Sequence, residues 1–144
     1  MKLRSLLFVP GDRRDRMAKA LGCGADALIL DLEDAVAPGA KGEARKAVAA
    51  FLAANEAARL WVRVNPLDSP EHAKDLAAVL PAHPDGIVLP KAEGGASVTE
   101  LSRRLAERGN ATAKIMAIAT ETPAAMFQLG SYGGLTRLAA LTWG

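Results

Sequence analysis

The sequence of 144 residues contains little cysteine, few aromatic residues and no long apolar segment. Its single cysteine, Cys23, excludes an internal disulfide and indicates a reducing compartment. No segment approaches the roughly 20 apolar residues of a membrane span. The first apolar run is broken by Pro10, Gly11 and Asp12, unlike the longer core of a signal peptide. We therefore expect a soluble, cytoplasmic protein that does not bind membranes.

The excess of charge of one sign is also small. Eighteen basic and 16 acidic residues leave a net charge of +2. Nucleic-acid binding needs a concentrated basic patch, so nothing here supports a nucleic-acid partner. Hydrophobic residues make up 50% of the chain but aromatic residues only 4%, which indicates a core of Ala, Leu and Val. The length suits a single domain.

Short apolar runs alternate with longer segments of helical period. The runs are apolar almost throughout, as expected for parallel strands that are covered on both faces. We predict six strands, at residues 5–10, 27–34, 60–66, 86–91, 114–120 and 138–143. We predict five helices between them, at residues 13–21, 42–55, 70–80, 97–108 and 123–129. Ser97 is the candidate N-cap of the fourth helix.

This strict alternation specifies a parallel α/β fold. No Gly-x-Gly-x-x-Gly segment follows the first strand, which weakens the case for a dinucleotide-binding open sheet. Polar residues instead follow the carboxyl ends of successive strands, where a TIM (β/α)8 barrel carries its active site. We expect residues 1–144 to be the N-terminal portion of one such barrel, with about the first six strands. The sequence looks truncated, because the barrel needs eight strands.

Arg63 lies inside a predicted buried strand. Alternation places Leu60, Val62 and Val64 on the face toward the helices, and Trp61, Arg63 and Asn65 on the other. A buried guanidinium is costly unless it meets an anion. Arg63 could bind a substrate carboxylate or thioester oxygen, or form a structural ion pair with Asp31 or Glu33. The strand pattern supports both interpretations equally.

Glu121 follows the fifth predicted strand. Ile115, Ala117 and Ala119 share its face, and the small alanines suit a crowded barrel interior. Thr122 can cap the next helix, with Pro123 at its first position, so Glu121 lies at a rigid junction. Magnesium usually binds one or two protein carboxylates, which makes Glu121 a candidate ligand. The alternative is a carboxylate that only offsets the helix dipole.

Other charged residues gather near the strand ends and helix starts. Asp31, Glu33 and Asp34 could bind metal or act as acid–base groups, but we favour a structural role in orienting Arg63. Lys91 could pair with these acids or meet an anionic ligand. Two basic clusters suit phosphate groups, or are simply solvated helix faces: Arg13, Arg14, Arg16 and Lys19, and Lys41 with Arg45. His72, His83 and Cys23 show no ligand spacing, and we interpret them as structural or incidental.

Several short segments follow one another in a recognisable order. They are RSLLFVPGD (4–12), GADA (24–27), ILDLEDAV (29–36), Lys41 with EAR (43–45), VRVN (62–65), LPK (89–91) and ET (121–122). In this order they resemble the citrate lyase β-subunit family, the acyl-CoA lyase branch of the HpcH/HpaI aldolase superfamily. The resemblance covers the whole chain.

The resemblance implies a TIM-barrel carbon–carbon lyase. Its substrate would be a 3-hydroxyacyl-CoA thioester such as citryl-, malyl- or citramalyl-CoA, cleaved or condensed through an enolate. It implies Mg²⁺ as cofactor with Glu121 as ligand, and catalytic, substrate-binding roles for Arg63 and Glu121. It also implies a homo-oligomer, trimer or hexamer, that binds acyl-CoA or a small carboxylic acid. Contacts with CoA or substrate are assigned to Phe8, Lys19, Lys41 and Arg45.

The end of the sequence departs from the family pattern. The family's second metal-ligand aspartate follows a Trp-Gly pair like Trp143-Gly144, so we expect only half of the metal site here. Two alternatives stay open: a pyruvate-type aldolase that acts on free 2-keto acids, and a non-catalytic CoA-binding subunit. The basic clusters favour CoA over a free keto acid. We expect a gap between the first and sixth strands, with the stripe of Ile115, Ala117 and Ala119 exposed in it.

Overall fold

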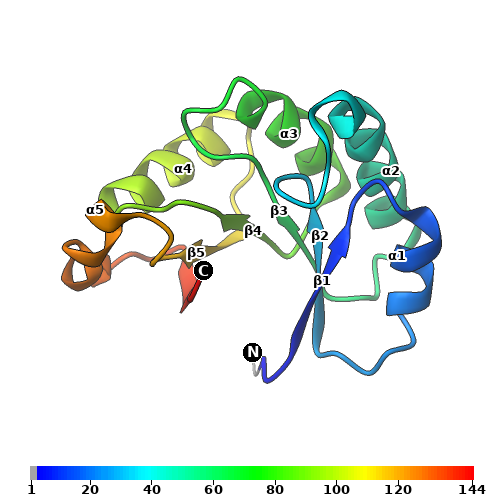
Figure 1. The fold of residues 1–144 in the computed structure, drawn as a ribbon, viewed down its shortest axis with the longest axis horizontal. Coiled ribbons are helices and arrows are strands. Elements are labelled where there is room, and N and C mark those ends of the chain that lie inside the picture. Colours follow the sequence, from blue (N-terminus) through cyan, green and yellow to red (C-terminus); the bar gives the residue numbers. More distant parts are fainter. Residues whose placement is uncertain (1–2) are drawn as a thin grey trace.

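One parallel sheet forms the centre of the protein, whose computed structural model describes residues 3–144. The six strands pair in chain order, β1-β2-β3-β4-β5-β6, and every neighbouring pair is parallel. Their bounds are β1 Leu6–Pro10, β2 Ala27–Asp31, β3 Leu60–Arg63, β4 Gly86–Leu89, β5 Lys114–Ile118 and β6 Leu138–Thr142. All six predicted strands are confirmed, and each begins or ends within a few residues of its predicted limits. The sheet curves into a partial barrel (Figure 1).

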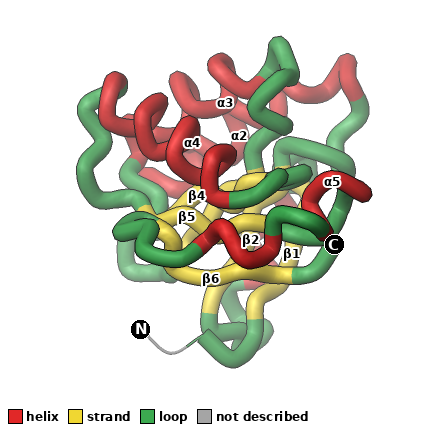
Figure 2. Tube along the Cα trace, turned by 90° about the vertical axis from the view of Figure 1, so that its left-hand side faces the viewer, coloured by secondary structure: helices red, strands yellow, loops and turns green. Residues whose placement is uncertain are grey.

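The helices lie on one face of this sheet. They are α1 Arg14–Ala20, α2 Lys41–Ala54, α3 His72–Val79, α4 Gly95–Glu107 and α5 Pro123–Met126, with short 3-10 turns at Pro38–Ala40, Leu80–Ala82 and Leu129–Tyr132. In Figure 1, α1 to α4 form an arc outside the strands, and Figure 2 shows the helical layer stacked on the sheet. This is the layer arrangement of a (β/α) barrel wall.

Two of the predicted helix starts are wrong. The fourth helix begins at Gly95 after an N-cap at Gly94, two residues before Ser97. The Ser97 hydroxyl instead accepts a hydrogen bond from the amide of Glu93, which satisfies a backbone donor just before the helix. The third helix begins at His72, because the preceding residues form turns. The predicted cap of α5 is confirmed, since the Thr122 hydroxyl accepts from the amide of Ala125 at 3.2 Å.

The sheet separates two apolar clusters. The larger one joins the outward side chains of the strands to the helices, and it contains Leu30, Val62 and Ile87 of the strands with Val48 and Leu101 of the helices. The smaller one fills the concave side with strand residues only: Ala27, Ile29, Trp61, Val88, Met116 and Ile118. The predicted faces of Leu60, Trp61, Val62 and Val64 are confirmed.

The predicted faces of β5 are wrong. Ile115, Ala117 and Ala119 belong to the helix-side cluster and are at most 2% exposed, whereas Met116 and Ile118 point into the barrel. The pairing explains this result, because Met116 lies opposite Val88 and Val88 lies opposite Arg63 on the inner face. The small alanines therefore make room for helices, and they are not exposed in the gap.

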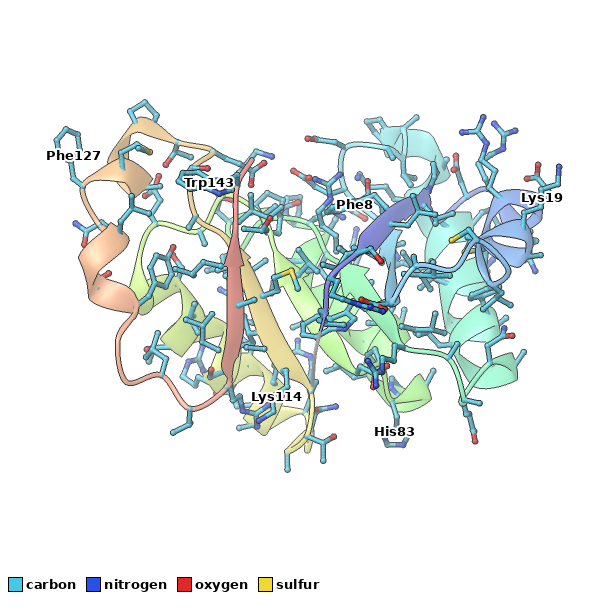
Figure 3. The ribbon with its side chains drawn as sticks, turned by 90° about the horizontal axis from the view of Figure 1, so that it is seen from below. Phe8, Lys19, His83, Lys114, Phe127 and Trp143 are labelled. Carbon is cyan, nitrogen blue, oxygen red and sulfur yellow. The ribbon has the colours of Figure 1, made fainter. Side chains whose placement is uncertain are left out.

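β1 and β6 are the edges of the sheet among residues 3–144. Neither pairs on its outer side, and Leu7, Phe8, Leu141 and Trp143 are exposed there. Figure 3 shows Phe8 of β1 and Trp143, just after β6, on opposite sides of this opening. The predicted incomplete barrel with its gap between the first and sixth strands is confirmed. No helix among the described residues is long and apolar enough to cross a membrane.

Candidate active site

Asp31 and Arg63 form the centre of the candidate site, at the carboxyl ends of β2 and β3. Arg63 donates from Nε to Asp31 Oδ1 at 2.8 Å and from Nη2 to Oδ2 at 2.6 Å. Asp31 also accepts from the amides of Glu33 and Ala35. Burial raises the pKa of the Asp31 carboxyl, but these hydrogen bonds, led by that of Arg63, lower it below its usual range. The predicted ion pair of Arg63 with Asp31 is confirmed.

Glu33 lies between two cationic side chains. Its Oε1 is hydrogen-bonded to Nζ of Lys91, and its Oε2 lies 3.2 Å from Nη1 of Arg63. The carboxylate is 4% exposed, and Oε2 has no hydrogen-bond partner in the described structure. Burial is the largest single effect on the pKa of Lys91 and lowers it, but the hydrogen bond to Glu33 and the attraction of the nearby carboxylates together raise that pKa above its usual value. Lys91 therefore pairs with Glu33, which is one of the two roles that we predicted for it.

Glu121 joins this cluster through the backbone of Lys91. The amide of Lys91 donates to Glu121 Oε2 at 2.6 Å. Lys91 has a φ of 51°, a left-handed conformation that is uncommon for lysine and that concentrates at functional sites. Asp31, Arg63, Lys91 and Glu121 thus converge at the carboxyl ends of the strands, as predicted.

Gly144 packs directly against Glu121. A Cβ atom built on Gly144 would collide with Cγ of Glu121 and would lie 2.6 Å from Cγ2 of Ile118. The amide of Gly144 donates to the Thr120 hydroxyl at 3.1 Å. Gly144 therefore lies beside the Glu121 side chain, and a side chain at position 144 would collide with it.

The remaining residues with predicted contacts to CoA or substrate fall into two groups. Phe8 and Lys19 line one open groove of about 330 Å³ beside β1, together with Arg16 and Cys23. The Phe8 ring also lies under the guanidinium of Arg63, 4.9 Å from its centroid, and so reaches the central cluster. Phe8 therefore connects the groove to the site, whereas Lys19 lies at its far end (Figure 3).

Lys41 and Arg45 are instead engaged by the protein itself. Lys41 Nζ donates to the carbonyls of Leu32 and Glu33 at 2.8 and 3.0 Å. Arg45 Nη1 lies 2.6 Å from Glu71 and 3.1 Å from Asp75. These contacts give both residues a structural role, and their contact with CoA stays a prediction.

Asn65 does not lie on the inner face of the barrel, where we predicted it. Its partner is Asp75, a buried acid that the sequence analysis did not identify. The strand ends at Arg63, so Asn65 turns out of the barrel and bonds to Asp75 of α3. A signal for Asp75 exists, because His72, Asp75, Leu76 and Val79 have the spacing of one buried helical stripe. Two ionisable residues on such a stripe indicate a buried polar network. His72 belongs to it through Nδ1, 2.7 Å from the Asn65 carbonyl.

The assembled site is suited to anionic, oxygen-rich ligands. Arg63 and Lys91 place two cations at the mouth, and Glu121 supplies one carboxylate oxygen beyond that bonded to the Lys91 amide. A small apolar groove of about 140 Å³ begins at Thr120, next to Glu121, and is lined further by Leu141 and Trp143. Charged groups beside an apolar groove can orient a small carboxylic acid.

The amino-acid sequence is similar to those of known proteins. Residues 4–141 match the family model described as HpcH/HpaI aldolase/citrate lyase. A citrate lyase subunit beta-like protein of Deinococcus radiodurans is 40% identical over 116 residues, which cover 74% of this chain and 39% of that protein. A (3S)-malyl-CoA thioesterase of Cereibacter sphaeroides is 38% identical over 97 residues, covering 66% of this chain and 34% of that protein.

A solved structure shares the fold. It is the protein CitE of Mycobacterium tuberculosis in complex with magnesium, acetoacetate and coenzyme A, with a TM-score of 0.79 and 33% identity. The match covers 96% of this chain and 47% of that one. The chain thus spans half or less of the length of these relatives. Its matching family model, its barrel wall and its cluster at the strand ends lead to one conclusion: the chain belongs to the HpcH/HpaI aldolase/citrate lyase family.

Proposed function

We propose that the protein is a Mg²⁺-dependent carbon–carbon lyase that cleaves or condenses a 3-hydroxyacyl-CoA thioester, such as citryl-, malyl- or citramalyl-CoA. One observation carries this proposal: Arg63 and Glu121, from strands that are not neighbours, are connected at the barrel mouth through Glu33 and Lys91. Cleavage beside a carbonyl needs groups that neutralise negative charge on oxygen, and this cluster gathers them.

Glu121 is the residue that would hold the metal. Among residues 3–144 no group of three or more His, Cys, Asp or Glu side chains could bind a metal ion. Magnesium does not need such a group, because it takes one or two carboxylates and keeps water and substrate oxygens in its other positions. Glu121 fits this arrangement, because only its Oε2 is bonded, to the Lys91 amide, and its other oxygen can bind a metal ion. When bound, Mg²⁺ would polarise the substrate carbonyl as a Lewis acid.

Arg63 would hold the substrate through the part of its guanidinium that Asp31 does not use. Nε and Nη2 bind Asp31, so Nη1, which lies 3.2 Å from Glu33 Oε2, is the nitrogen that would donate to a substrate carboxylate or thioester oxygen. Asp31 keeps the guanidinium in place while this happens. The relatives support the substrate class, since one is named for malyl-CoA and another was solved with coenzyme A.

The test compares Glu121→Gln with Glu93→Gln in the protein expressed from its complete gene. Glu93 is an exposed carboxylate that accepts a hydrogen bond from Thr122, and so it is a nearby matched control. Glu121→Gln should lose Mg²⁺-dependent turnover by about 100-fold or more with little change in Tm. Glu93→Gln should keep it. Undiminished turnover in Glu121→Gln would remove this residue from the mechanism.

A second candidate function is the aldol cleavage of free 2-keto acids. It is favoured by the engagement of Lys41 and Arg45 with protein groups, which removes part of the basic surface expected to bind CoA. Turnover should be compared for each 3-hydroxyacyl-CoA thioester and for free 4-hydroxy-2-keto acids, which an aldolase would cleave to a 2-keto acid and an aldehyde. A kcat/KM that is higher for the keto acids would replace the first proposal with this one.

A further inference from the structure

The start of the loop after β3 is held by a dense set of hydrogen bonds to α3. The Asn65 amide and its Nδ2 both donate to Asp75 Oδ2, at 2.8 and 2.7 Å. The Asn65 carbonyl is bonded to Nδ1 of His72 at 2.7 Å. Asn65 is two residues beyond Arg63, so α3 determines where the Arg63 end of the strand lies.

The same asparagine also holds the loop that carries Glu33. Its Nδ2 donates to the Leu32 carbonyl at 3.0 Å, and the Leu32 amide donates to the Arg63 carbonyl at 2.9 Å. Lys41 Nζ shares the Leu32 carbonyl and adds that of Glu33. Hydrogen bonds therefore connect the chain after β2 to the chain after β3, beyond the last paired residues of the sheet.

Asp75 is a costly residue for this purpose. Its side chain is fully buried, and its charged partner is Arg45, which also pairs with Glu71 nearer the surface. Burying an ion pair is often no better for stability than apolar packing in the same place. The carboxylate instead fixes the orientation of Asn65, because its Oδ2 accepts hydrogen bonds from both the amide and Nδ2 of Asn65.

We propose that Asp75 is a positioning residue, which acts through Asn65 to set the distance between Arg63 and Glu33 at the barrel mouth. This role rests on the proposed function, since it concerns Arg63 as the group that binds substrate. Asp75 touches neither substrate nor metal. It fixes the end of β3, which carries Arg63, and the loop after β2, which carries Glu33.

The experiment uses Asp75→Asn in the protein expressed from its complete gene, with Val79→Ala as control. Asparagine has one acceptor oxygen, so it cannot accept from both Arg45 and Asn65 as the two oxygens of Asp75 do. Val79 is fully buried in the same helix but forms no hydrogen bond with the loop, so Val79→Ala lowers Tm and leaves the hydrogen bonds of Asn65 in place. Asp75→Asn should lower kcat/KM by about 10–100-fold, because a displaced Arg63 would be misplaced for the substrate that it binds.

A spectroscopic readout makes the test independent of turnover. Arg63 Nε–H donates to Asp31, and its NMR signal should shift or broaden in Asp75→Asn and stay unchanged in Val79→Ala. If Asp75→Asn does not fold, Asn65→Ser replaces it, because serine keeps the backbone bond to Asp75 and loses the bond to Leu32. It should then show the same changes.

Two outcomes would overturn the proposal. In one, Asp75→Asn keeps both the wild-type kcat/KM and the wild-type Arg63 signal. In the other, Val79→Ala loses kcat/KM as much as Asp75→Asn at the same Tm, which would reduce the effect to general stability. A wild-type protein that turns over no thioester would contradict the proposed function instead, and the Arg63 signal would still decide whether Asp75 positions that side chain.

Discussion

Arg63 has three different partners around one guanidinium. Two of its nitrogens bind Asp31, the third lies near Glu33, and the plane of the group covers the Phe8 ring. Only a planar, forked group can do this, because a lysine ammonium is a point charge without two parallel donors. The residue thus combines an ion pair that the fold needs with a donor that a ligand can use.

Replacing Arg63 by lysine tests this combination. Arg63→Lys keeps the positive charge but loses the two-point bond to Asp31, so kcat/KM should fall by about 100-fold and Tm should also decrease. Steady-state kinetics and thermal unfolding of the same preparation measure both effects. A decrease in Tm with normal kinetics would leave Arg63 with the structural ion pair alone.

Gly144 offers a second prediction at the scale of one residue. A methyl group there would collide with the Glu121 side chain, so Gly144→Ala should weaken Mg²⁺ binding by about 10-fold while the fold is kept. Gly133→Ala is a matched control, because its Cβ would meet no atom within 4 Å and its φ is −63°. Calorimetric titration with Mg²⁺ measures the effect, and equal affinities in the two variants would contradict it.

At the scale of the element, α3 combines apolar packing with a polar network. Leu76 and Val79 join the core, while His72 and Asp75 on the same stripe bond to Asn65. His72 is fully buried, and its Nε2 has no partner among the described residues. Burial lowers the pKa of His72 from its usual value near 6.5, so the folded protein keeps the ring neutral.

This pKa predicts how stability depends on pH. Because the pKa of His72 is lower in the folded protein, the unfolded chain binds more protons at His72 near and below pH 6.5, so the free energy of unfolding should fall as the pH is lowered from about 7 toward about 5. Above about pH 7.5, where His72 is neutral in the unfolded chain as well, its contribution should be constant. Denaturant unfolding of the wild type and His72→Gln at several pH values provides the measurement. An equally steep decline in His72→Gln would assign the dependence to other groups.

At the scale of the whole molecule, both edge strands of the sheet expose apolar side chains. β1 and β6 lack an outer neighbour among residues 3–144, and Leu7 and Leu141 are 40% and 46% exposed. Unpaired strand edges with apolar side chains promote association between chains. Both edges border the one opening of the curved sheet.

Residues 1–144 expressed alone should therefore associate in a concentration-dependent way. A double variant, Leu7→Lys with Leu141→Lys, should reduce this association, because charged residues on an edge oppose pairing with another chain. Sedimentation velocity over a range of concentrations measures the change. A wild-type fragment that stays monomeric throughout would show that these edges do not need a partner.

Much of the architecture was determined by the sequence alone. Near-continuous apolar runs separated by helical periods specify parallel strands covered by helices, and all six strands and five helices are present. Arg63 stood out because a charge inside a buried strand needs a partner, and Asp31 provides it. Thr122 and Pro123 predicted the start of α5 because capping depends on a few neighbouring residues.

Other features were decided only by the tertiary structure. In β5 both faces are apolar, so periodicity could not show which one meets the helices, and pairing with β4 placed Met116 inside the barrel. Lys41 and Arg45 have the same local pattern whether they bind a ligand or the protein. Their acceptors lie on other elements: the loop after β2 for Lys41, and α3 for Arg45. Asp75 meets Asn65 for the same reason, since packing between elements distant in sequence determines where a buried charge finds its partner.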